Sequence, residues 1–172
     1  DHNVRCARLK RDMISLDSEV IKMNATNFFE AAWVFKRNGT YYFSYSTTPK
    51  AQMRIDYMTS DNPTNGFTYR GVVADQPPVN NNNNHASQFE FKGRWYHVYH
   101  NRIVAKQAGI PTGFRRNLAI EELSFNDDGL IKKVAYTTNG VVQQGHLNPF
   151  TRGEGETCDA EKGVETEPCS EG

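Results

Sequence analysis

The sequence predicts a nearly all-β fold that forms part of a β-propeller. Aromatic and β-branched residues occur in short alternating runs bounded by glycine, asparagine and proline, and apolar residues keep helical spacing for no more than a turn or two. The segment GTYYFSY, which begins at Gly39, aligns with GRWYHVY, which begins at Gly93, 54 residues later. A repeat of roughly 50 residues built from short strands is typical of a four-stranded propeller blade.

Each element follows from an alternating run with a turn signal beside it. Glycine or asparagine in RNG, PTNG, KG and NDDG supplies the positive φ that tight turns need. A third strand-turn-strand unit, residues 113–137, predicts a further blade with Arg115 and Arg116 at its entrance. In order, the predicted strands are Val4–Leu9, Ala32–Arg37, Thr40–Ser46, Arg54–Thr59, Thr68–Val73, Ala86–Phe91, Arg94–Asn101, Asn117–Phe125 and Ile131–Tyr136.

Three units are fewer than the roughly four to eight blades that close a propeller. We therefore expect residues 1–146 to be a partial propeller, which is a fragment, one piece of a nicked protein, or a chain that closes its ring by self-association. Residues 147–172 are acidic, rich in glycine and poor in apolar residues. Such a composition indicates a linker followed by the start of another domain.

The composition excludes several classes of partner. The 172 residues contain 20 Lys+Arg and 20 Asp+Glu, so no net charge attracts nucleic acid or an anionic membrane, and neutral ligands fit best. The polar N-terminus does not resemble a signal peptide, and no apolar run is long enough to span a bilayer. Cys6, Cys158 and Cys169 lack metal-ligand spacing, and the last two are able to pair in a secreted protein.

Glu30 is the first candidate for chemistry, because it is the one carboxylate in the apolar run FFEAAWVF. Burial there would raise the carboxyl pKa and keep the acid protonated near neutral pH, as a general acid requires. The alternative is a channel-lining glutamate that is hydrogen-bonded to the backbone or paired with an arginine. In the blade repeat, His85 occupies the place that corresponds to Glu30, so both side chains are expected to face one cavity.

His85 and the arginines of the third unit complete the candidate set. His85 follows an asparagine-rich loop, and a lone histidine is more often structural than catalytic. Because neighbours on a strand face opposite ways, only one of Arg115 and Arg116 should enter the channel, and Arg116 is favoured. His97 and His100 are treated as structural, and Asp127-Asp128-Gly129 is interpreted as a turn rather than a calcium loop.

With these residues identified, the chain resembles glycoside hydrolase family 43, the five-bladed propeller enzymes that remove arabinofuranosyl or xylosyl units from xylan and arabinan. The resemblance runs from about residue 5 to residue 142. It is carried by FFEAAWVFKRNGTYYFSYS, SDNPTNGFTYRGVV, NHASQFEFKGRWYHVYHNR and GFRRNLAIEELSFNDDGLIKKVAYTTNGV. The tail from Leu147 is similar to the junction and opening strand of a family 6 carbohydrate-binding module.

The resemblance implies roles for particular residues. Glu30 matches the general acid of an inverting mechanism, followed here by Ala31-Ala32 where relatives commonly have Gly-Pro or Ala-Pro. His85 matches a histidine deep in the channel, near a central water or a cation such as calcium. Arg116 matches an arginine that contacts the sugar, and Trp33 is the candidate aromatic at the substrate. No cofactor is implied as a requirement.

The catalytic base and the aspartate that modulates the acid belong, in this family, to blades upstream of the segments matched here. The resemblance therefore implies about three of five blades of a secreted arabinofuranosidase or xylosidase, carrying the acid but not the base, and inactive alone. Its partners would be plant cell-wall polysaccharide and the missing N-terminal blades. The alternatives are a partial propeller that binds carbohydrate without cleaving it, and one chain of a nicked enzyme.

Overall fold

The computed structural model describes residues 2–48, 50, 52–79 and 84–142. The chain divides into two units, residues 1–141 and 142–172, and everything below concerns the first. The linker, the binding-module segment, Cys158 and Cys169 lie outside the described residues, and so does the predicted domain boundary at residue 146. Among the described residues, no helix has the length and apolar character needed to cross a membrane.

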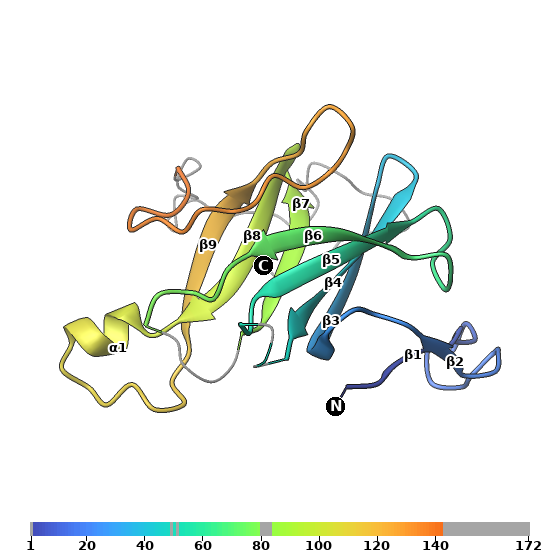
Figure 1. Cartoon of the computed structure of the whole chain (residues 1–172), viewed down its shortest axis with the longest axis horizontal. Coiled ribbons are helices and arrows are strands. Elements are labelled where there is room, and N and C mark those ends of the chain that lie inside the picture. Colours follow the sequence, from blue (N-terminus) through green and yellow to red (C-terminus); the bar gives the residue numbers. More distant parts are fainter. Residues whose placement is uncertain (1, 49, 51, 80–83, 143–172) are drawn as a thin grey trace, which may run out of the picture. The chain divides into compact units, whose positions relative to one another are not determined.

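A four-stranded antiparallel sheet is the largest element of the unit (Figure 1). Its strands follow one another in sequence and in space as β3 (Phe28–Arg37), β4 (Thr40–Thr47), β5 (Ile55–Ser60) and β6 (Thr68–Ala74). The β3–β4 turn is two residues long, Asn38 and Gly39, both at positive φ. The meander β3-β4-β5-β6 is the arrangement expected of one propeller blade.

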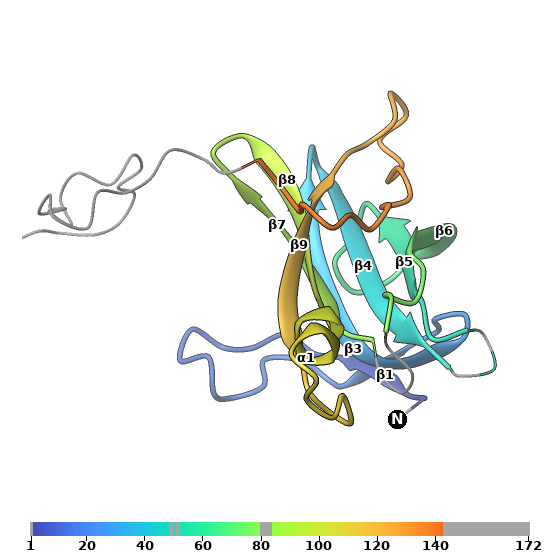
Figure 2. The ribbon, with the colours of Figure 1, turned by 90° about the vertical axis from the view of Figure 1, so that its left-hand side faces the viewer.

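A second antiparallel sheet has three strands, β7 (Ala86–Phe91), β8 (Arg94–Asn101) and β9 (Asn117–Leu123). The single turn of helix α1 (Ile103–Gln107) follows β8 and lies beside β9 (Figure 2). A two-stranded hairpin, β1 (Val4–Cys6) and β2 (Ile21–Met23), forms a third sheet. The described residues therefore fold as three antiparallel sheets, and the all-β prediction is confirmed.

Alternation along β4 explains how the sheets pack. Tyr42 belongs to a core cluster with Phe35 and Tyr57 that also includes Leu123 of β9 and Ile131 and Val134 after it. Phe43 and Tyr45 belong to a second cluster with Val4 of the hairpin. Because successive side chains point to opposite faces of a strand, both faces of the sheet are covered. That is why strand β5 is buried along its whole length.

The third predicted unit is not a blade of its own. Residues 117–123 form β9, which pairs with β8 over its whole length from Trp95↔Leu123 to Asn101↔Asn117. The predicted strand Ile131–Tyr136 makes only isolated bridges, Phe125↔Ile131 and Ala74↔Val134. The reason is that this segment packs its apolar side chains against the four-stranded sheet instead of adding a strand. The repeat of residues 29–46 in residues 85–101 corresponds to two hairpins, β3–β4 and β7–β8, whereas residues 113–137 do not form a third.

Candidate active site

Glu30 lies on an irregular part of β3. The register with β4 passes from Phe28↔Thr47 to Glu30↔Ser46 to Trp33↔Ser44, so an extra residue is inserted on each side of Glu30. Ala31 has a φ of 57°, a conformation that costs a residue with a Cβ about 1–2 kcal/mol. Bulges and local strain of this kind are found beside active sites, where they re-aim a side chain.

The redirected carboxylate meets His85. The His85 Nε2 and Glu30 Oε1 atoms are 3.0 Å apart, and the side chains are 39% and 33% exposed. The bond joins the start of β3 to the residue before β7, and β3 lies against β7. The two residues that the blade repeat set in corresponding places are thus in contact. The Glu30 side chain is half-buried among the described residues, and full burial of this carboxyl stays a prediction.

His100 lies behind His85, and sequence analysis assigned it no role at the site. Their ring centroids are 6.0 Å apart. His100 is only 7% exposed, and both of its ring nitrogens lack a hydrogen-bond partner among the described residues. Burial, followed by the charges of Arg116, His85 and Arg102, lowers the pKa of His100 to about 4, so the ring is neutral near neutral pH.

The register of the β7–β8 hairpin predicts that His100 lies next to His85. The two-residue turn at Lys92 and Gly93 pairs Ala86 with Tyr99. Extending that register by one residue places His85 opposite His100, and cross-strand neighbours on one face interact. The same register pairs Gln88 with His97, whose side chains are in fact 3.1 Å apart.

Arg116 approaches the site from the same sheet as His85, not from a third blade. It precedes β9, is exposed, and its charge contributes to the lowered pKa of His100. Arg115 is held in its own loop, where its Nε donates to the Pro111 carbonyl at 3.1 Å and its carbonyl accepts from the buried Arg102. This arrangement agrees with the preference for Arg116, whose role at a substrate stays a prediction.

Trp33 braces the two sheets. Its indole Nε1 donates to the Gln88 carbonyl at 2.8 Å, and the side chain is 39% exposed. The Gln88 side chain is fully buried and accepts from Ser44 Oγ at 2.6 Å. These bonds fix β7 against β3, the strand that carries Glu30, and against β4. Sugar stacking on Trp33 stays a prediction, and the exposed part of the indole is the surface on which it would occur.

The donors around His85 do not make a metal site by themselves. Over the described ranges, no group of three or more His, Cys, Asp or Glu side chains is placed to hold an ion. His85 Nε2 is bonded to Glu30, and the nearby arginine charges disfavour a cation. The cation expected near His85 therefore stays a prediction, and no chemical step below depends on it.

Comparison with known proteins gives a consistent result. The family model described as glycosyl hydrolases family 43 matches residues 1–131. An arabinoxylan arabinofuranohydrolase of Paenibacillus polymyxa is 39% identical over 176 residues, which cover 95% of this chain and 27% of that protein. The chain thus spans little more than a quarter of the length of this relative.

Two solved structures extend the match to three dimensions. A family 43 arabinoxylan arabinofuranohydrolase from Bacillus subtilis, solved with cellotetraose, has a TM-score of 0.75 at 37% identity, covering 86% of this chain and 32% of that one. An α-L-arabinofuranosidase from Clostridium thermocellum has a TM-score of 0.68 at 47% identity, covering 79% of this chain and 46% of that one. The structural neighbours are propeller enzymes, which confirms the partial-propeller prediction.

Proposed function

Because this chain belongs to family 43 of the glycosyl hydrolases, we propose that it is part of an inverting enzyme that removes arabinofuranosyl units from arabinoxylan. Xylosyl units are the second candidate, since the sequence resemblance covers both activities. The observation that carries the proposal is the contact between Glu30 and His85, set on a strained bulge at the junction of two blades.

Glu30 is proposed as the general acid. His85 occupies Oε1, and Oε2 has no partner among the described residues. A protonated Glu30 is therefore able to donate from Oε2 to the oxygen of the leaving sugar while the imidazole fixes the carboxyl plane. A general acid positioned in this way contributes about 10²–10⁴-fold to the rate.

Arg116 and His85 are proposed to orient the sugar. A guanidinium presents several N–H donors in a fixed plane, which suits the hydroxyls of a pentose. His100 supports His85 from behind as a neutral ring that does not compete for a proton near neutral pH. Trp33, on the same strand as Glu30, is 39% exposed and is proposed as the aromatic that contacts the sugar.

The base is proposed to come from a part of the protein that this chain does not contain. An inverting enzyme needs a second carboxylate roughly 6.5–9.5 Å from the acid, with a water between them. The greater length of the relatives supports this proposal. So do the strongly exposed apolar side chains Met13, Ile14, Phe114 and Leu118, which are 71–87% exposed and would be covered by further blades.

A polymeric substrate fits an extracellular enzyme, because a polysaccharide does not cross a membrane, and secretion is proposed on that ground.

In the longer protein that we propose contains this chain, arabinoxylan should yield arabinose, and proton NMR in the first minutes should show the inverted anomer. The 172-residue chain alone should give no turnover. Release of the retained anomer, or turnover by the chain alone, would contradict the proposal.

A further inference from the structure

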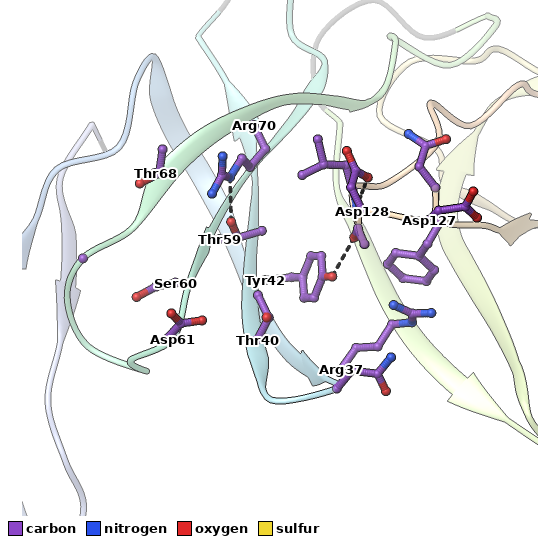
Figure 3. Close-up of a pocket in the computed structure, with 16 residues that line it drawn as sticks. Arg37, Thr40, Tyr42, Thr59, Ser60, Asp61, Thr68, Arg70, Asp127 and Asp128 are labelled. Carbon is purple, nitrogen blue, oxygen red and sulfur yellow. Dashed lines mark hydrogen bonds between the residues drawn. The ribbon is translucent and has the colours of Figure 1, made fainter.

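A hollow lies at the opposite end of the four-stranded sheet from Glu30. It has a volume of about 680 Å³ and is walled by the turn ends of β3 to β6 on one side and by the loop Phe125–Leu130 on the other (Figure 3). Arg37 and Thr40, at the β3–β4 turn, line it. Arg37 is seven positions beyond Glu30 along β3, which is at most about 23 Å at roughly 3.3 Å per residue.

The walls of this hollow are fixed to each other. Tyr42 Oη donates to the Gly129 carbonyl at 2.7 Å, and the Ile131 amide donates to Tyr57 Oη at 3.0 Å. Phe125 packs against Tyr42, with ring centroids 5.7 Å apart. Every lining residue belongs to the first unit and to the described residues. The cavity is therefore formed before any ligand arrives.

Charged side chains with unused hydrogen-bonding capacity line the cavity. The Arg37 guanidinium lies 4.0 Å above the Phe125 ring and makes no hydrogen bond or ion pair with a described residue. Asp61 on the sheet side and Asp127 on the loop side have no hydrogen-bond or ion-pair partner there either. Arg70 uses its Nε on Thr59 Oγ1 at 2.8 Å, which leaves its terminal nitrogens for a ligand. Donors and acceptors thus both line this hollow.

This set of groups selects a class of ligand. Three carboxylates in the lining, with Asp128 as the third, disfavour a phosphate or another anion. The carboxylates do not gather into a metal site among the described residues. A neutral polyol satisfies both kinds of group, because each hydroxyl donates to a carboxylate and accepts from a guanidinium.

We propose that this hollow is a second carbohydrate subsite, which binds a segment of a neutral polysaccharide chain through Arg37, Arg70, Asp61 and Asp127. The choice of xylan as the polysaccharide rests on the proposed function. The existence of the subsite does not, since it depends only on the groups that line the hollow. Such a subsite would hold the polymer on one face of the protein while another segment enters the site at Glu30.

The test is a titration of the 172-residue chain with xylohexaose, followed by heteronuclear NMR. Shifts are expected at the Arg37, Asp61 and Asp127 amides. The double variant Asp61→Asn and Asp127→Asn keeps side-chain size, and it should lose about tenfold or more in affinity, because a hydrogen bond to a charged group is worth that much. Glu122→Gln, an exposed carboxylate on β9, is the matched control and should bind normally.

Glu30→Gln separates this inference from the proposed function. It should slow the release of arabinose from arabinoxylan by the longer protein about 10²–10⁴-fold and leave the titration of the hollow unchanged. Absence of binding by the wild-type chain, unchanged affinity in the double variant, or an equal loss in Glu30→Gln would each overturn the second subsite. None of these results bears on whether Glu30 is the acid.

Discussion

The two ends of strand β3 contrast in regularity. From Val34 to Arg37 the strand pairs with β4 residue by residue and closes in a tight turn of Asn38 and Gly39. From Phe28 to Trp33 the register shifts twice, and Ala31 is held at a φ of 57°. The regular end is stabilised by aromatic stacking, whereas the irregular end presents a carboxylate to a histidine. One strand therefore provides core packing at one end and carries the proposed acid at the other.

The largest effect is expected at the irregular end. Glu30→Gln in the longer protein should slow the release of arabinose from arabinoxylan by about 10²–10⁴-fold, because it removes the transferable proton. Glu90→Gln, a matched exposed carboxylate near the turn end of the β7–β8 hairpin, should leave kcat unchanged. Steady-state kinetics on both variants measures kcat. A similar loss of kcat in both would show that the irregular end of β3 has no special role in catalysis.

The next effect is on stability at the regular end. Phe35 is 9% exposed and lies 4.7 Å from Tyr42 and 4.9 Å from Trp95 between ring centroids. Phe35→Ala should lower the free energy of unfolding by about 3–5 kcal/mol. Val34→Ala, at a position that is 48% exposed, should cost well under half as much. Urea unfolding of the purified chain measures both, and equal losses would show that the core does not lie on that face.

An effect of intermediate size is the pH dependence of stability that arises from His97, at the junction between the two sheets. Burial lowers the pKa of His97 from 6.5 to about 4. Between pH 6.5 and 4, His97 therefore binds a proton in the unfolded chain but not in the folded chain. The free energy of unfolding falls as the pH drops through this range. The loss is about 3 kcal/mol for this residue.

His97→Gln, which retains a hydrogen-bonding group opposite Gln88, should flatten the fall in stability over that pH range. His2→Gln, at an exposed histidine, should not. Urea midpoints at several pH values between 7 and 4 make the measurement, and parallel curves for wild type and His97→Gln would refute the role of this ring.

The smallest effect concerns the backbone beside the acid. Ala31→Gly should stabilise the chain by up to about 1 kcal/mol, since glycine adopts positive φ without the Cβ penalty. Asn38→Gly at the turn end should gain less, because asparagine tolerates that region well. Thermal melts of the two variants compare the ends directly, and destabilisation by Ala31→Gly would show that the bulge is not strained.

Many of the regular strands were predictable from sequence. Alternation and the turn residues located β7 and β8 at their observed bounds and β4 to within a residue. The sequence did not reveal β2, a three-residue strand, or α1, a single helical turn, because neither is long enough to show a period. Nor did it show that residues 124–136 pack as an irregular segment against the other sheet.

The candidate site was predictable only where the sequence repeat reached it. The repeat set Glu30 and His85 in corresponding positions, and the structure brings them into contact. The bulges around Glu30 were not predictable, because nothing in Glu30-Ala31-Ala32 signals positive φ. His100 was interpreted as structural although the hairpin register places it behind His85. The apolar neighbours of Glu30 in sequence alternate faces, so they leave its side chain half-buried among the described residues.

The leaving-group dependence of Glu30→Gln in the longer protein tests the central claim most directly. Hydrolysis of arabinoxylan, whose leaving group is a sugar alkoxide, requires protonation, whereas an activated aryl arabinofuranoside such as the 4-nitrophenyl glycoside needs little. The acid role predicts a large loss of kcat on arabinoxylan and a small loss on the aryl glycoside. An equal loss on both substrates would contradict it and would reduce Glu30 to a residue that holds His85 in place.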